Sequence, residues 1–129
     1  MIPYAEERIA KYFKRYEFAC RGSDCCGHSA PVDKRLLDAL DDLRERAGVP
    51  LRINSGFRCR VHNKKIGGAD TSQHARGLAA DVGLPRDMTI EELATHAEHV
   101  PAFEQGGIGL YPTFIHVDVR GKKARWDNR

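Results

Sequence analysis

Two short stretches of the chain contain side chains that bind divalent metal ions. His74 and Asp81 lie seven positions apart in TSQHARGLAADVG, and glycine and alanine fill most of the gap between them. A catalytic zinc site takes three protein ligands from His, Asp, Glu and Cys and keeps a fourth position for water. His116, inside the apolar run FIHVDV, is either the third ligand or a core histidine whose burial is offset by hydrogen bonds.

Longer motifs surround these residues. SGFR spans Ser55 to Arg58, the pattern S-x-H-x-x-G-x-A-x-D runs from Ser72 to Asp81, and FIHVDV covers Phe114 to Val119. In type and order, the three motifs resemble those of the zinc D-Ala-D-Ala carboxypeptidase family. That family includes phage L-alanyl-D-glutamate endopeptidases and shares its fold with the hedgehog signalling domain. The resemblance covers roughly Val32 to Trp126.

The resemblance implies a role for each matching position. His74, Asp81 and His116 are expected to hold one catalytic Zn²⁺. Arg58 matches the arginine that family members place near the substrate, where a guanidinium holds a carboxylate or carbonyl in forked geometry. A surface salt bridge is the alternative for this arginine. Two neighbours of the first ligand are substrate-binding candidates, able to orient the imidazole or to donate to a tetrahedral oxyanion. They are Ser72 and Gln73.

The general base is harder to assign. Many relatives carry Asp or Glu three residues before the last zinc histidine, and here that position is Thr113, which cannot take a proton near neutral pH. Side chains alternate faces along a strand, so Asp118 shares a face with His116 and Thr113 does not. Asp118 is therefore expected either to act as the catalytic base or to fix the ring of His116. Glu104 is a third candidate for the base.

These assignments predict a zinc-dependent metallopeptidase. It would hydrolyse stem or cross-link peptide bonds of bacterial peptidoglycan, as a D-Ala-D-Ala carboxypeptidase or an endopeptidase, and the sequence does not choose the bond. The partners expected are peptidoglycan peptides, and the protein is expected to be a monomer. The alternative is a non-catalytic, zinc-stabilised module that binds cell wall or protein, which the missing acid at Thr113 favours.

Helical signals occur in three places. An amphipathic helix is predicted from Tyr4 to Tyr16, and a second from the N-cap Asp33 to about Ala47, before Gly48. Thr89 and Glu92 form a capping box for a third helix that runs to about His99. The first two carry apolar residues at helical spacing: Ile9, Tyr12, Phe13 and Tyr16, and Leu36, Leu37, Leu40 and Leu43.

Four segments read as strands, and Ser55 to Gly68 reads as irregular. The strands are Leu51 to Asn54, Ala79 to Gly83, Gly107 to Leu110 and Thr113 to Val119, the last two joined by a Tyr111-Pro112 turn. The fold class predicted is α+β, with about three helices on a small, mainly antiparallel sheet. The resemblance implies the hedgehog/DD-peptidase arrangement. One domain is expected over residues 1–129, with a helix and a Cys-rich loop in 1–31 and the core in 32–126.

Four cysteines stand apart from these motifs: Cys20, Cys25, Cys26 and Cys59. Their C-x4-C-C spacing is not the C-x2-C of a zinc knuckle, so a second structural metal has little support from spacing. A disulfide would join one of the first three to Cys59, and plain thiols are the third possibility.

The composition is 41% hydrophobic and 30% charged, which is typical of soluble globular proteins. No apolar run approaches the roughly 20 residues of a membrane span, so no membrane association is expected. The stretch MIPYAEERIAKYFKRYEF lacks the features of a secretory signal. We therefore expect a cytoplasmic protein that acts at the bacterial cell wall after release by another route, as a phage-encoded lysin does.

The net charge is +3, and the basic segment RGKKARWDNR carries much of the excess. Such a segment is either solvated or attracted to an anionic polymer such as nucleic acid or a bacterial wall. The chain lacks the interleaved aromatics and dense Lys/Arg patches that nucleic-acid binding favours. No nucleic-acid partner is expected.

Overall fold

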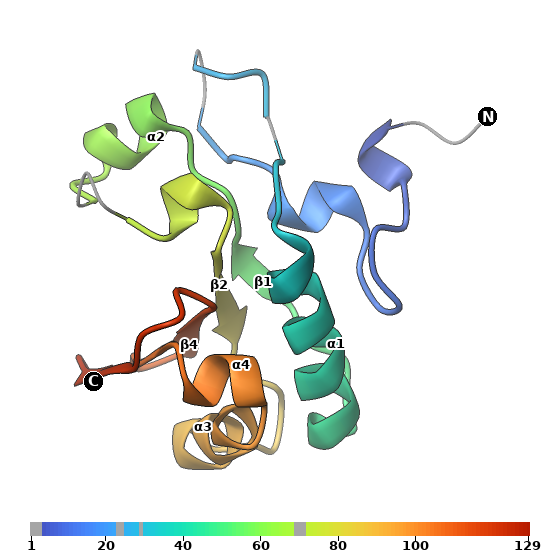
Figure 1. The fold of residues 1–129 in the computed structure, drawn as a ribbon, viewed down its shortest axis with the longest axis vertical. Coiled ribbons are helices and arrows are strands. Elements are labelled where there is room, and N and C mark those ends of the chain that lie inside the picture. The colour runs from blue at the N-terminus through green and yellow to red at the C-terminus, as the bar shows by residue number, and fades with distance from the viewer. Residues whose placement is uncertain (1–3, 23–24, 29, 69–71) are drawn as a thin grey trace.

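The computed structural model describes residues 4–22, 25–28, 30–68 and 72–129. Its centre is a five-stranded sheet with strand order β1-β2-β4-β3-β5, of which Figure 1 labels β1, β2 and β4. The strands are β1 (Ile53–Ser55), β2 (Ala79–Gly83), β3 (Gly107–Leu110), β4 (Phe114–Asp118) and β5 (Ala124–Asp127). Three neighbouring pairs are antiparallel, while β3 and β5 run parallel. The predicted α+β class with a mainly antiparallel sheet is confirmed, and the sheet is mixed.

The two central strands separate core side chains from polar ones. β2 and β4 pair without a break, from Ala79 opposite Asp118 to Gly83 opposite Phe114. Because side chains alternate along a strand, Ile115 of β4 points to one face and His116 to the other. The first is fully buried in the hydrophobic core. The sheet therefore has one apolar face and one face that carries the motif residues.

Helix α1 (Lys34–Ala47) forms where the leucine stripe predicts it. The Asp33 carboxylate accepts a hydrogen bond from the Arg35 amide at 2.8 Å, and Gly48 ends the helix at φ 72°. The four leucines of the stripe are buried: Leu36, Leu37, Leu40 and Leu43. Helix α3 (Ile90–Glu98) begins with the predicted capping box of Thr89 and Glu92.

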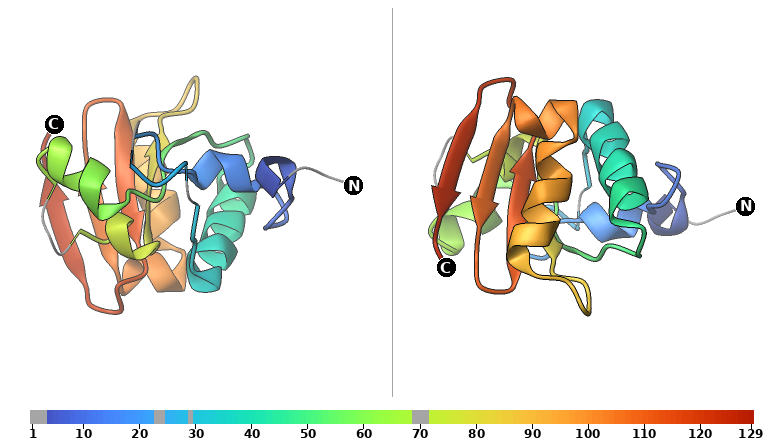
Figure 2. Two further views of the ribbon diagram at one scale, coloured as in Figure 1. Left: turned by 90° about the horizontal axis from the view of Figure 1, so that it is seen from above. Right: turned by 90° about the horizontal axis from the view of Figure 1, so that it is seen from below.

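Helices cover the apolar face of the sheet. Figure 2 shows α3 and the short α4 (Pro101–Glu104) against one face, with α1 beside them, and α2 (Arg60–Lys65) on the opposite side. Phe103 of α4 is fully buried between these layers. The sequence did not predict α4, because its single turn is too short to show helical periodicity.

The predicted helix over Tyr4 to Tyr16 is wrong. This segment forms two short 3-10 helices, η1 (Tyr4–Glu6) and η2 (Arg15–Phe18), with an antiparallel bridge between Arg8 and Lys14. Asp41 of α1 accepts the backbone N–H groups of residues 11 and 12 at 2.9 and 3.1 Å. Those donors are thus taken by another element, and tertiary contacts override the helical spacing of the aromatic residues.

Two further segments differ from the predictions. Residues 60–65 of the predicted irregular stretch form α2, which Cys59 caps by accepting a hydrogen bond from the His62 amide. The basic segment contributes β5, which adds an edge to the sheet. Parts of the predicted Cys-rich loop, residues 23, 24 and 29, and residues 1–3 lie outside the described residues. Among the helices described, none has the length and apolar character to span a bilayer.

Candidate metal centre and substrate cavity

The three predicted metal ligands come together at the polar face of the sheet. Asp81 of β2 and His116 of β4 are direct cross-strand partners, and His74 begins the 3-10 helix η3 (His74–Arg76) just before β2. Asp81 Oδ1 lies 3.1 Å from His74 Nε2 and 3.2 Å from His116 Nδ1. One possible ligand atom from each residue lies within 4.8 Å of the other two. This set of two imidazole nitrogens and one carboxylate oxygen is typical of zinc sites.

In each imidazole, the outer nitrogen, which is the one that does not face Asp81, already has an acceptor. His74 Nδ1 lies 2.7 Å from the carbonyl oxygen of Gly56, and His116 Nε2 lies 2.7 Å from Asp118 Oδ2. In the neutral rings these nitrogens carry the proton, so the inner nitrogens direct lone pairs toward the Asp81 carboxylate. Three acceptors that meet in this way need either shared protons or a metal cation between them, and the residues present fit Zn²⁺.

Without a cation, protons take its place. Burial alone raises the pKa of Asp81, but hydrogen bonds from His116 and His74 outweigh it and hold that pKa well below the usual range. Burial alone lowers the pKa of His116, yet its hydrogen bonds to Asp118 and Asp81 raise it above the usual value. Proton and metal ion thus compete for the same position.

Asp118 contacts the imidazole nitrogen that does not face Asp81. Its carboxylate is fully buried and accepts hydrogen bonds from the Gly107 amide at 2.9 Å and from Arg120 Nε and Nη2 at 2.9 and 2.7 Å, besides the contact with His116. Against the effect of burial, the hydrogen bonds from His116 and Arg120 hold the pKa of Asp118 well below its usual range. A Cβ at Gly107 would collide with this carboxylate, so the close approach requires glycine there.

A cavity of about 550 Å³ opens beside the three ligands. The three residues predicted to bind substrate line it, together with the three ligands and four side chains to which the sequence assigned no role: Arg58, Ser72, Gln73, His74, Asp81, Tyr111, Phe114, His116, Arg120 and Trp126. Asp118, Thr113 and Glu104 are not among the lining residues. Glu104 instead forms a surface ion pair with Lys123 at 3.4 Å.

Arg58 borders this cavity, and its hydrogen-bonding capacity is not fully used by the described residues. Its Nη2 donates to Ser72 Oγ at 3.3 Å, but its buried Nε has no hydrogen-bond partner among the described residues. Gln73 Oε1 is also buried and without a partner within the described part of the chain. Burial lowers the pKa of Arg58, which increases the gain from an anionic ligand. A carboxylate in the cavity would satisfy the guanidinium.

An aromatic cluster, which comprises Tyr111, Phe114 and Trp126, lies next to His116. The rings of Tyr111 and Phe114 stack with centroids 4.4 Å apart, and Trp126 Nε1 donates to Tyr111 Oη at 2.9 Å. The Trp126 ring is centred 5.0 Å from that of His116. Strand alternation from His116 was a signal for Phe114, two residues earlier. Trp126 had no such signal, because its strand was not predicted.

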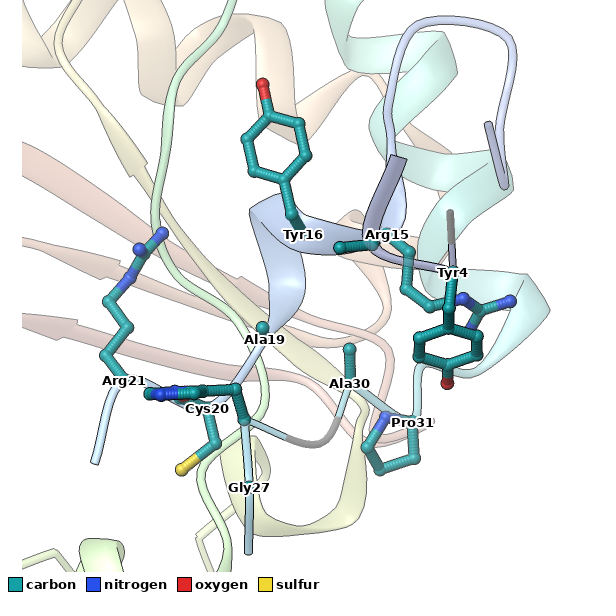
Figure 3. A pocket seen from close by; sticks show the side chains of 11 residues that line it. Tyr4, Arg15, Tyr16, Ala19, Cys20, Arg21, Gly27, Ala30 and Pro31 are labelled. Carbon is teal, nitrogen blue, oxygen red and sulfur yellow. The ribbon is translucent and has the colours of Figure 1, made fainter. Parts of the chain in front are cut away.

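A second cavity lies between the N-terminal segment and the loop that begins at Cys20 (Figure 3). Its volume is about 890 Å³, and Tyr4, Arg15 and Pro31 are among the side chains around it. It shares no lining residue with the cavity beside His74. Of these two cavities, only the smaller is lined by motif residues.

A family model described as Peptidase M15 matches residues 11–118, which include His74, Asp81 and His116. No curated protein matches the chain.

Proposed function

The chain belongs to the peptidase M15 family, and from this premise we propose that it hydrolyses peptide bonds of bacterial peptidoglycan with one catalytic Zn²⁺. One observation carries the proposal: two imidazole lone pairs and a carboxylate oxygen meet beside a cavity with an unsatisfied arginine. The metal ligands proposed are His74, Asp81 and His116. A bound Zn²⁺ would supply Lewis acidity that polarises the scissile carbonyl and lowers the pKa of a water molecule.

Asp118 is proposed to position His116 rather than to take the substrate proton. Its carboxylate holds the outer N–H of the imidazole, which directs the inner lone pair to the metal position. The carboxylate is fully buried, and Gly107 and Arg120 occupy its remaining acceptor sites. These contacts favour the ring-fixing role over the role of general base, the other role that the sequence allowed.

Arg58 is proposed to bind a carboxylate of the stem peptide. Its guanidinium lines the cavity and has a buried donor, Nε, without a partner among the described residues, and an arginine binds a carboxylate through two parallel hydrogen bonds. Ser72 and Gln73 border the same space and are proposed to hydrogen-bond the substrate backbone. Holding the peptide in this way aligns the scissile carbonyl with the metal position.

The aromatic cluster is proposed to contact the apolar side of the peptide. Phe114 and Trp126 line the cavity next to His116. Their rings exclude water from the reacting carbonyl, which strengthens the electrostatic interactions there. Short stem peptides contain alanine side chains small enough for such a surface.

The bond cut is either the terminal D-Ala-D-Ala bond, the L-Ala-D-Glu bond or a cross-bridge. A carboxypeptidase requires a free C-terminal carboxylate beside the scissile bond, and Arg58 suits that need. An endopeptidase uses the same arginine for a D-Glu carboxylate. Action at the cell wall after release, as by a phage lysin, is part of this proposal.

A second function has a specific observation in its favour. Asp81 is the one carboxylate among the described residues that line the cavity, and it is a proposed metal ligand. A site without a separate base is suited to binding rather than to hydrolysis. The alternative is a zinc-stabilised module that binds peptidoglycan peptides without cutting them.

Mass spectrometry of purified peptidoglycan fragments distinguishes the two functions. The zinc-loaded protein is incubated with muropeptides beside a chelated sample and beside His74→Ala. A product that forms only with zinc and not with the variant supports hydrolysis, and its mass identifies the bond. Binding of the same fragments without any product, by a folded and zinc-replete protein, contradicts the peptidase and supports the module.

A further inference from the structure

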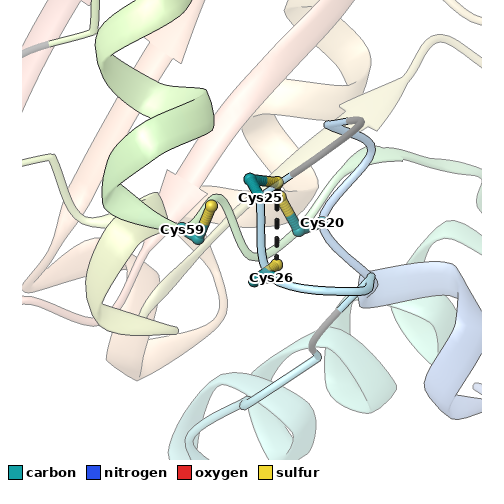
Figure 4. Close-up of side chains that lie close together, drawn as sticks. All are labelled: Cys20, Cys25, Cys26 and Cys59. Carbon is teal, nitrogen blue, oxygen red and sulfur yellow. Dashed lines mark hydrogen bonds between the residues drawn. The ribbon is translucent and has the colours of Figure 1, made fainter.

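Four cysteine side chains converge beside α2, and none of them lines the cavity next to His74 (Figure 4). Three come from the loop after η2 and the fourth caps α2: Cys20, Cys25, Cys26 and Cys59. Their sulfur atoms all lie within 4.8 Å of one another, and no disulfide joins these four described residues. We propose that the cysteine cluster binds a second, structural Zn²⁺ through four thiolates.

The sulfur separations suit a tetrahedral metal ion. Cys25 Sγ lies 4.0 Å from Cys20 Sγ and 3.9 Å from Cys26 Sγ. Zinc–sulfur bonds of about 2.3 Å place the sulfurs of a tetrahedral site about 3.8 Å apart. A disulfide requires about 2.0 Å, so these sulfurs would have to move much further to form one. The chain spacing did not predict this site, because the fourth ligand lies 33 residues after Cys26 and only the fold brings it close.

The surroundings of the sulfurs agree with a structural site. The His62 amide donates to Cys59 Sγ at 3.4 Å, and an N–H donor of this kind stabilises a metal-bound thiolate. Four cysteines also fill a tetrahedral coordination shell and leave no position for water or substrate.

The ion would add bonds to a segment that lacks regular secondary structure. The described residues of the loop, 20–22 and 25–28, contain neither helix nor strand. Gly22 packs so closely on the His62 ring that a Cβ there would collide with it, so the loop lies directly against α2. Metal bonds across this contact fix the loop to the start of α2, and their free energy adds to that of folding.

The cluster also lies one residue from the proposed substrate arginine. Cys59 follows Arg58, whose amide donates to the His74 carbonyl at 3.2 Å. A metal bond at Cys59 therefore restrains the backbone from which the Arg58 side chain enters the cavity. This consequence rests on the proposed function, whereas the metal site itself does not.

Metal analysis of the full chain tests the proposal. The protein is purified in reducing buffer with zinc, beside Cys59→Ser and His74→Ala. Serine is a strong N-cap residue, so Cys59→Ser keeps an acceptor for the His62 amide and removes only the metal ligand. We expect one zinc for each of the two clusters in the parent protein. Each variant should lose the zinc of its own cluster and keep that of the other.

Cobalt substitution provides a second readout, which the parent protein and His74→Ala give even without the cysteine variant. Thiolate-bound Co²⁺ has sulfur-to-metal charge-transfer absorption that a His2Asp site lacks. Cobalt-loaded His74→Ala should keep this absorption, and cobalt-loaded Cys59→Ser should lose it. The proposal is overturned if the parent protein and His74→Ala both lack the absorption, if Cys59→Ser keeps all the zinc, or if the reduced protein contains disulfides by intact mass. Zinc at both clusters with no peptide cleavage would contradict the proposed function and support this site.

Discussion

The imidazole of His116 lies between two aspartates, and each carboxylate contacts a different ring nitrogen. Asp81 faces Nδ1 and Asp118 faces Nε2. In Asp118→Asn, the amide can no longer satisfy His116 and Arg120 together, because its NH2 group would face N–H donors. We expect zinc affinity at this centre to fall by about 10- to 100-fold, which competition with a chelator would measure.

Asp127→Asn is the matched control for this substitution. Asp127 is an exposed aspartate of β5 that pairs with Arg129, so the zinc affinity of Asp127→Asn should equal that of the parent protein. Unchanged zinc affinity in Asp118→Asn, with turnover lost, would contradict the positioning role. That outcome would identify Asp118 as the general base.

The guanidinium of Arg58 has a shape that lysine cannot reproduce. Arg58→Lys keeps the positive charge but loses the forked pair of donors in the cavity. We expect kcat/KM on muropeptides to fall by about 10- to 100-fold, as the loss of a charged hydrogen bond implies, with zinc content unchanged. Arg60→Lys, an exposed neighbour on α2, should behave like the parent. Equal kinetics for the two variants would count against carboxylate binding at Arg58.

For helices and strands, local sequence signals were sufficient to predict an element where the segment itself contains its capping residues and a continuous pattern of apolar residues. Helices α1 and α3 carry their N-caps and apolar spacing within the segment, and β2 and β3 have the predicted bounds. The N-terminal segment has the same kind of spacing, but its amide donors bond to Asp41, which lies about 30 residues later. The spacing of residues within the segment cannot predict a contact with a residue so far along the chain.

The candidate site likewise has residues that the sequence predicted and residues that it did not. The motifs name His74, Asp81, His116 and Arg58 directly, and the structure brings these side chains around one cavity. Its aromatic cluster was not predicted, because Trp126 belongs to an edge strand whose arginine and aspartate residues resemble a solvated segment. An edge strand with one charged face gives a weak strand signal.

Gly109 links this edge strand to the metal centre. It pairs with His116 on one side and Trp126 on the other, and a Cβ there would overlap the indole ring. Gly109→Ala should displace Trp126 from His116 and lower the free energy of unfolding by about 1–3 kcal/mol in denaturant titrations. Because the chain has one tryptophan, its fluorescence maximum should shift to longer wavelength as well.

Ile108→Val separates displacement of the ring from simple loss of stability. Ile108 is a buried core residue of β3, and its truncation should cost about 0.5–1.5 kcal/mol without any change in tryptophan emission. Parent-like emission and stability in Gly109→Ala would show that Trp126 does not occupy the position described over Gly109.

For the whole molecule, proton binding and zinc binding at His116 both stabilise the fold, but they exclude each other and depend on pH in opposite directions. The pKa of His116 is raised above its ordinary value of 6.5, so the protonated ring stabilises the zinc-free fold fully below that pH. This contribution is lost as the pH rises through the raised pKa. Zinc needs the neutral ring, so its own stabilising effect must grow over the same interval while Asp81, whose pKa is lowered, stays ionised.

The difference in Tm between zinc-loaded and chelated protein should therefore increase as the pH rises toward and through the raised pKa of His116. Differential scanning calorimetry at fixed zinc concentration measures it. Zinc binding to the cysteine cluster would also increase the difference in Tm with pH, because thiols lose protons when they bind zinc. The measurement is therefore made in Cys59→Ser, in which only the histidine centre binds zinc. A difference in Tm that stays constant with pH in this variant would mean that no proton leaves when zinc binds. The two imidazoles could then not be the ligands, whatever the protein does to peptidoglycan.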